Sequence, residues 1–195
     1  YTIYRVYLCV VIVLLLLRND GNIQSPKGKE KPKATEDIMN TKTARQIEEM
    51  KKQTIGVEIE MNSISRSKAA KLASQFFGTG RYKNTADRNG YCTYSAWDEQ
   101  GREWKFQKDV SIAGIDSEKC EMVTPILNYS DIETLQELVR ILRKAGAKSD
   151  STRGCGVHIH IGAKGHTAKT LRNLANIMAS HEQLLICLLY TSDAA

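Results

Sequence analysis

The chain has 195 residues, of which 42% are hydrophobic and 26% charged, the balance of a soluble globular protein with one ordinary domain. Its three prolines and thirteen glycines exclude collagen-like and low-complexity classes. Much of the net charge of +6 lies in residues 27–33 and 140–148 without an accompanying aromatic array, so nucleic acid is not an expected partner.

The N-terminal 49 residues differ from the rest of the chain. Residues 6–17 are uniformly apolar or aromatic, but a membrane span needs about 20 such residues and no small-residue cleavage site follows. We therefore expect no stable membrane span here, and interpret the run as upstream sequence read as protein, with Met39 or Met50 as the true start. Residues 19–37 have linker composition.

These patterns predict three parts: a leader and linker over residues 1–49, a folded domain over 50–185, and a foreign tail over 186–195. The odd number of cysteines and the absence of any C-x-x-C pair argue against a disulfide framework or a zinc ribbon. Each cysteine is expected to be a small buried side chain, and the compartment is expected to be the cytoplasm.

The first convincing element is a strand over residues 54–61, where apolar and polar residues alternate strictly. A helix over residues 66–77 follows, with Ser65 as its N-cap and Gly78 as its stop. Residues 90–98 and 102–109 form two strand-like runs joined by a short turn that contains Gly101, which predicts a hairpin.

The second half continues with a short strand over residues 119–124, which Pro125 ends. Ser130 and Glu133 read as the capping box of a helix that ends at Gly146. A strand over residues 157–161 and a helix capped by Thr167 complete the pattern. Strands and helices do not alternate regularly, so the expected class is α+β, with a curved antiparallel or mixed sheet and helices on one face.

Two motifs place chemical groups on strands. Glu58 and Glu60 leave the same face of their strand about 6.5–7 Å apart, and like charges on a half-buried face favour a bound cation. His158 and His160 repeat this geometry after Gly154-Cys155-Gly156, which suits a metal or a phosphate. A solvated strand face, two ordinary histidines and a flexible glycine turn are the simpler interpretations.

Asp109 ends one predicted strand and Glu121 lies in another. Each alone would usually be a surface carboxylate, but four strands that all offer acids or imidazoles on a polar face indicate a shared site. Mostly oxygen ligands favour Mg²⁺ or Mn²⁺ over zinc.

The ordered series T-I-G-V-E-I-E-M, W-K-F-Q-K-D-V-S-I, E-M-V-T-P-I-L, L-R-K-A-G-A and G-C-G-V-H-I-H-I resembles the amidoligase family, in the glutamine synthetase and glutamate–cysteine ligase superfamily. The resemblance covers residues 50 to 185. It implies a truncated glutamine-synthetase-like fold that binds ATP and magnesium, and that joins a small-molecule or peptide carboxylate to an amine through an acyl phosphate.

The resemblance also implies roles for particular residues. Metal ligands are expected among six side chains: Glu58, Glu60, Asp109, Glu121, His158 and His160. Asp109, His160 and Arg153 would contact the nucleotide, and the candidates for catalytic residues are Glu58, Glu121 and Arg153. A solvated loop is an equally good interpretation of Arg153.

Two other functions remain open from the sequence. A metal-dependent hydrolase could use Glu58 or Glu121 as a base on metal-bound water, although no H-E-x-x-H motif is present. A non-enzymatic basic binding module has only the lysine-rich linker in its favour.

Overall fold

The structure, a computed structural model, describes residues 33–86 and 90–184. The chain divides into two compact units, of which Thr54–Ile161 is one. The described helices α2 (Lys33–Lys51) and α5 (Ala168–Ser180) belong to the other. The apolar run 6–17 and the tail 186–195 lie outside the described residues, as do Cys9 and Cys187. Among the described helices, none combines the length and hydropathy needed to cross a bilayer.

The unit Thr54–Ile161 is built on one six-stranded sheet in the order β2-β3-β4-β5-β1-β6. All neighbouring strands are antiparallel, so the mixed alternative does not apply. The strands are β1 (Ile55–Met61), β2 (Tyr82–Asn84), β3 (Tyr94–Trp97), β4 (Glu103–Gln107), β5 (Cys120–Val123) and β6 (Val157–Ile161).

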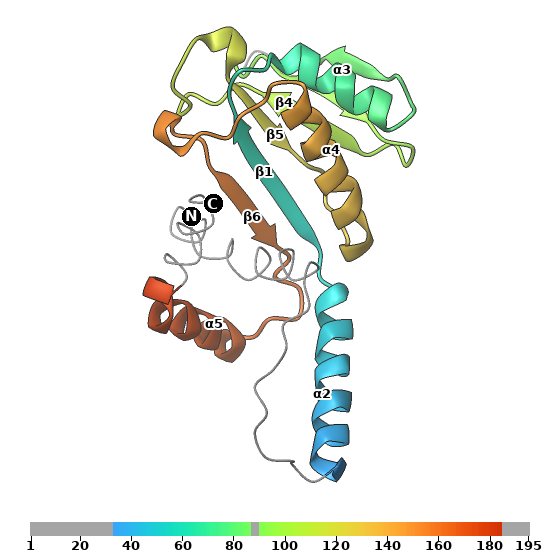
Figure 1. Ribbon diagram of the computed structural model, residues 1–195, viewed down its shortest axis with the longest axis vertical. Helices are drawn as coiled ribbons and strands as arrows, with labels where there is room; N and C mark the ends of the chain where they lie inside the picture. The colour runs from blue at the N-terminus through green and yellow to red at the C-terminus, as the bar shows by residue number, and fades with distance from the viewer. Residues whose placement is uncertain (1–32, 87–89, 185–195) are drawn as a thin grey trace. The chain divides into compact units, whose positions relative to one another are not determined.

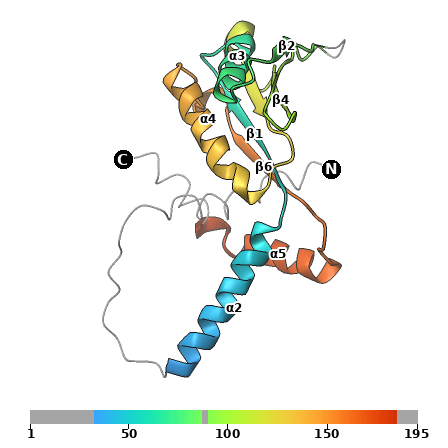
Figure 2. The ribbon, with the colours of Figure 1, turned by 90° about the vertical axis from the view of Figure 1, so that its right-hand side faces the viewer.

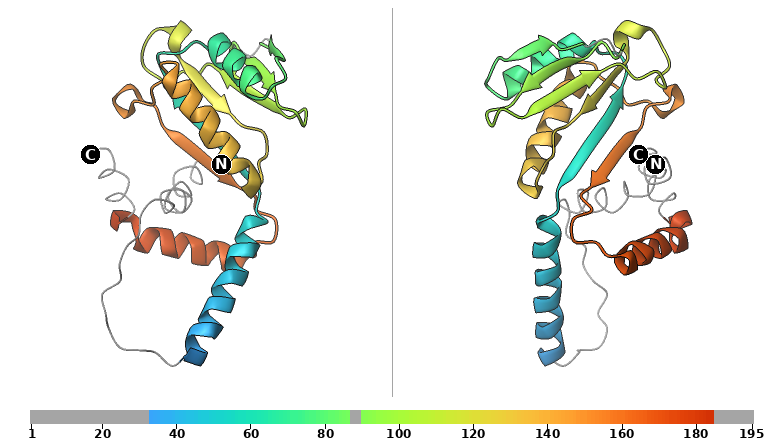
Figure 3. Two further views of the ribbon diagram at one scale, coloured as in Figure 1. Left: turned by 45° about the vertical axis from the view of Figure 1, so that its right-hand side comes forward. Right: turned by 180° about the vertical axis from the view of Figure 1, so that it is seen from behind.

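Helices α3 (Arg66–Phe76) and α4 (Ile132–Lys144) lie on one face of this sheet (Figures 1 and 2). The view from behind shows the strands in front of these two helices (right panel of Figure 3). The α+β class with helices on one face is therefore confirmed. We call the face opposite α3 and α4 the open face of the sheet.

Alternation along the strands separates the core from the open face. In β1, Val57 and Met61 are buried among the apolar core residues, while Glu58 and Glu60 lie on the opposite side. Helix α3 packs closely through small residues, since Ala69, Ala70 and Ala73 are completely buried. Such small side chains let a helix backbone approach the sheet.

An aromatic contact joins the end of α3 to the sheet. The Phe77 and Trp104 rings lie with their centroids 5.0 Å apart. Helix α4 buries Leu135, Leu138 and Leu142, which belong to the stripe that helical periodicity predicts.

The helix caps predicted from the sequence are confirmed at α3 and α5 but not at α4. The Ser65 side chain accepts a hydrogen bond from the Lys68 amide, and Thr167 caps α5. The predicted capping box of Ser130 and Glu133 is wrong.

At that third helix, Asn128 and Asp131 form a capping box around the 3₁₀ turn Tyr129–Asp131, directly before α4. Asp131 also accepts bonds from the Arg102 guanidinium. A partner distant in the sequence thus helps to decide where the cap lies.

Three further features differ from the predictions. Residues 33–37, read as linker, belong to α2, a polar helix in which Lys51 forms an ion pair with Glu48. The short edge strand β2 was not anticipated, because its three residues are all exposed and carry no alternation. Cys92 is exposed rather than buried, unlike Cys120 and Cys155.

Candidate metal centre

The centre of the open face holds two directly opposed carboxylates. Glu60 on β1 is paired with Glu121 on β5, and the two residues are only 5% and 6% exposed. Burial raises the pKa of both side chains, and the neighbouring acids raise the pKa of Glu121 further. Two buried like charges in register destabilise a sheet unless a cation or a proton lies between them.

Each of these carboxylates is oriented by one hydrogen bond. The Gly156 amide donates to Glu60 Oε2 at 2.7 Å, and Gln107 Nε2 donates to Glu121 Oε2 at 2.8 Å. Within the described residues, the second oxygen of each side chain receives no hydrogen bond. Both glutamates therefore keep one oxygen that can act as a ligand.

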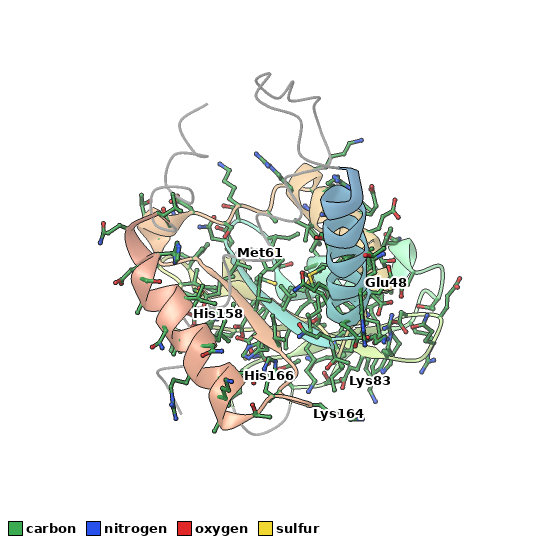
Figure 4. All side chains as sticks on the ribbon, turned by 90° about the horizontal axis from the view of Figure 1, so that it is seen from below. Glu48, Met61, Lys83, His158, Lys164 and His166 are labelled. Carbon is green, nitrogen blue, oxygen red and sulfur yellow. The ribbon has the colours of Figure 1, made fainter. Side chains whose placement is uncertain are left out.

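Glu58 lies between two imidazoles of β6. Its Oε2 is 3.1 Å from His158 Nδ1, and its Oε1 is 3.2 Å from His160 Nε2. Strand register explains this arrangement, because Glu58 pairs with His158 and Gly56 pairs with His160. Without a side chain at Gly56, the imidazole of His160 can lie beside Glu58 rather than against a neighbour. Figure 4 labels His158 on its strand.

Asp109 lies just after β4 in a loop that is held from two sides. Its Oδ1 accepts bonds from the Ser111 amide and hydroxyl, both at 2.6 Å. On the other side, a Cβ on Gly154 would lie 2.7 Å from the Ser111 carbonyl oxygen. Gly154 also has a φ of +76°, so the close approach and the backbone conformation both require glycine.

These side chains form two adjacent groups of potential ligand atoms. One consists of Glu58, Glu121 and His158, the other of Glu60, Asp109 and Glu121, and within each group the ligand atoms lie within 4.8 Å of one another. Glu121 belongs to both. Carboxylate oxygens with one imidazole, partly buried and repelling one another, make a donor set that fits one or two hard divalent cations.

A protein-family model matches most of the chain. The model of the family described as "Putative amidoligase enzyme" matches residues 51–194 of the chain. The chain belongs to the amidoligase family. The match includes all six strands of the sheet. It also runs past residue 185 into the segment 186–195, which the sequence pattern predicts to be a foreign tail. Searches of curated proteins and of solved structures gave no match.

The structure brings together most, but not all, of the residues predicted as the amidoligase site. Glu58, Glu60, Asp109, Glu121 and His158 fall within the two groups. His160 contacts Glu58 but belongs to neither group, and its side chain is 46% exposed.

Arg153 is also outside both groups. It is exposed, and its Nε is 3.7 Å from Asp150 Oδ2. Its backbone carbonyl accepts a bond from the Ala113 amide at 2.7 Å, which holds it to the loop that follows Asp109. The Arg153 backbone is thus held next to the loop that follows Asp109, and within the described residues its side chain forms no ion pair with the acids of the two groups.

Three supporting groups were not identified from the sequence: Gln107, Ser111 and the Gly156 amide. Gln107 could have been found, because it lies two residues before Asp109 and therefore shares the open face with Glu121. Ser111 has the spacing of an Asx turn with Asp109. The role of the Gly156 amide depends on the pairing of β1 with β6, and no local pattern indicates it.

Proposed function

We propose that this amidoligase is an ATP- and magnesium-dependent ligase that joins a carboxylate to an amine through an acyl phosphate. The observation that carries the proposal is the buried, opposed pair of Glu60 and Glu121, with Asp109, Glu58 and His158 around it. A set of converging carboxylates is the usual protein contribution to magnesium–nucleotide chemistry.

The two groups of ligand atoms suggest two cation positions, with Glu121 shared between them. Divalent cations held there would neutralise phosphate oxygens and disperse the charge that develops during phosphoryl transfer. His158 can take part with Nε2 while its Nδ1 hydrogen bonds to Glu58, since one ring nitrogen of a neutral histidine donates and the other carries the lone pair.

In the proposed reaction, a carboxylate oxygen of the substrate attacks the γ-phosphorus of ATP and ADP leaves. The amine nitrogen then attacks the acyl carbon, phosphate leaves with the electrons of the C–O bond, and the nitrogen loses a proton. The protein supplies position rather than covalent chemistry: the Gln107 side chain and the Gly156 amide orient the two buried glutamates, and Ser111 orients Asp109.

The test is nucleotide turnover with a chemical trap. ADP release is measured with Mg²⁺, with amino acids and dipeptides as carboxylates, and with hydroxylamine as a general amine that converts an acyl phosphate to a hydroxamate. We expect ADP and hydroxamate in equal amounts, and a loss of at least a hundredfold in Glu58→Gln and Glu121→Gln.

Glu137→Gln is the matched control, because Glu137 is an exposed acid of α4 whose contact is an ion pair with Arg140. Turnover that persists in Glu58→Gln and Glu121→Gln would reject the assignment of these residues. Cleavage of the dipeptides without nucleotide, lost in the same two variants, would show instead that the site belongs to a metal-dependent hydrolase.

A further inference from the structure

A hollow of about 500 Å³ lies where β4 begins and β5 ends, and is lined mainly by Glu103, Lys105, Val123, Pro125 and Ile126. This volume is within the range of small-molecule sites. No residue of the hollow belongs to the two groups of the metal centre. The hollow is therefore a separate feature of the same sheet.

Strand register places the hollow directly beside the metal centre. Val123 is paired with Lys105 on one side and with Glu58 on the other. Neighbouring strands are about 4.8 Å apart, so the edge of the hollow is a single strand spacing from Glu58. A small molecule could reach from the hollow to the acids without leaving the sheet surface.

Of the cationic side chains that line the hollow, Lys105 has the weaker contacts with carboxylates of the protein. Arg102 is held by close contacts to Asp98 and Asp131, both at 2.8 Å. Lys105 Nζ, by contrast, is 4.0 Å from Glu103 Oε2, and its side chain is 49% exposed.

The acid beside Lys105 is itself engaged elsewhere. Glu103 Oε1 accepts a hydrogen bond from Ser95 Oγ at 2.6 Å, which draws that carboxylate toward β3. Lys105 can therefore form an ion pair with an incoming anion at low cost.

Of the remaining lining residues, Val123, Pro125 and Ile126 are apolar and Thr124 is polar. Ile126 is 73% exposed. An aliphatic group that covered Ile126 and Val123 would remove their apolar surface from water. One ammonium group next to an apolar wall is complementary to a carboxylate with an aliphatic chain.

We propose that this hollow binds the carboxylate substrate, with Lys105 paired to a carboxylate group near Glu58 and the aliphatic part against Val123 and Ile126. The inference rests on the proposed ligase function and names the class of its acid substrate. The acid would be one with an aliphatic portion of several carbons rather than a purely polar one.

Methyl NMR of the chain, without nucleotide, tests the inference. The probes are straight-chain carboxylates from acetate to octanoate, with hexylammonium as the control of opposite charge. We expect hexanoate to shift the methyl signals of Val123 and Ile126, and binding to tighten by roughly fourfold per added methylene until the hollow is filled.

Lys105→Gln should weaken hexanoate binding at least fivefold. Lys83→Gln is the matched control: Lys83 pairs with Ser95, which pairs with Lys105, so both lysines share the open face, but Lys83 does not line the hollow. Figure 4 labels Lys83. The control should change the dissociation constant less than twofold.

Several results would overturn the inference: no binding of any carboxylate up to octanoate, equal effects of the two lysine variants, equal binding of hexylammonium, or no dependence on chain length. Carboxylate-dependent ADP release is measured separately on the same variants. ADP release without an effect of Lys105→Gln on hexanoate binding would reject the substrate site alone. If no sample releases ADP, the wild type included, while hexanoate still binds at Val123, the ligase function alone is rejected.

Discussion

Glu60 and Glu121 face each other across the β1–β5 pair as directly opposed residues, and both are almost completely buried. Each keeps one hydrogen bond, to the Gly156 amide and to Gln107 respectively. A fold that only needed stability would gain from an uncharged residue at either position. The pair is therefore explained best by a function that requires closely spaced carboxylates.

The Glu121→Gln variant should distinguish the effect of this carboxylate on the stability of the fold from its effect on metal binding. Glutamine retains an acceptor for Gln107 but removes one of the opposed charges, so we expect the metal-free variant to be more stable than the wild type by about 0.2–1 kcal/mol at neutral pH. Added Mg²⁺ should raise the melting temperature of the wild type and not of the variant. Thermal melts in chelator and in excess Mg²⁺ measure both effects, and a variant that is less stable in chelator would contradict the argument.

The same pair sets a pH dependence for the metal-free chain. Burial raises the pKa of Glu60 and Glu121 above the ordinary value of 4.5, so the folded state holds their protons more tightly than the unfolded state does. Their contribution to stability is complete below that value and is lost as the pH rises through the raised pKa. We expect the free energy of unfolding, measured with urea in chelator, to fall over this range, and to fall less in Glu121→Gln.

The two histidines of β6 should differ in their effect on metal affinity. His158 belongs to a group of ligand atoms, whereas His160 only contacts Glu58 and is more exposed. His158→Ala should weaken Mn²⁺ binding by at least tenfold, and His160→Ala by a smaller factor. Isothermal titration calorimetry with Mn²⁺ gives both constants, and the reverse order would exclude His158 as the ligand.

Gly154 and Gly101 form a natural pair of test positions. Both have a φ of +76°, but only Gly154 has a neighbour in the way, the Ser111 carbonyl oxygen. Alanine at either position costs about 1–2 kcal/mol for the left-handed backbone. In Gly154→Ala, the steric conflict with the Ser111 carbonyl oxygen should lower the free energy of unfolding by about 2 kcal/mol more than in Gly101→Ala.

The displaced Ser111 would also release Asp109, so Gly154→Ala should weaken Mn²⁺ binding. Urea unfolding compares the stability of the two variants and calorimetry compares their metal affinity. Equal losses in Gly101→Ala and Gly154→Ala would show that the contact between the two loops has no energetic role.

Arg102 should be important for the stability of the unit Thr54–Ile161. It bridges Asp98 and Asp131, and its hydrogen bonds lower the pKa of Asp131. Arg102→Met leaves two largely buried carboxylates without their cation, which should cost about 2–3 kcal/mol after allowance for partial exposure. Arg140→Met, which removes only an exposed ion pair with Glu137, should cost less than about 0.5 kcal/mol.

The loss in Arg102→Met should also depend on pH. An aspartate whose folded pKa is lowered contributes stability that is present above its ordinary value of 3.8 and is lost as the pH falls through the lowered pKa. The difference between wild type and Arg102→Met should therefore shrink in acid. Urea unfolding at pH 7 and near pH 3 measures this, and a constant difference would mean that the arginine acts through packing alone.

Local pattern was sufficient for most of the helices and strands, though not for β2 or the start of α2, and for the face on which their side chains lie. Strict alternation places Glu58 and Glu60 on one face of β1, and the bounds of β6 agree with the predicted strand over residues 157–161. Period-two geometry is a property of the extended backbone, so it can be derived from the residues themselves. The caps Ser65 and Thr167 are also local, since each bonds to an amide three residues away.

The tertiary structure alone decided which of these groups meet. His158 and Glu58 are 100 residues apart in the chain, and their contact depends on the register of β1 with β6. A shift of that register by one residue would move every side chain of β6 to the other face, which the alternation of both strands disfavours. Alternation alone does not distinguish the observed register from one displaced by two residues. Long-range packing sets it.

The same reason explains the cap that was placed incorrectly. Ser130 and Glu133 have the right spacing, but the bonds from Arg102 to Asp131 join residues 29 positions apart, and no pattern in residues 128–133 reveals them. Spacing along a strand or helix determines which side chains share a face of that element, because backbone geometry is local. Which carboxylate becomes the partner of which cation depends on the packing of distant segments, and only the folded chain decides it.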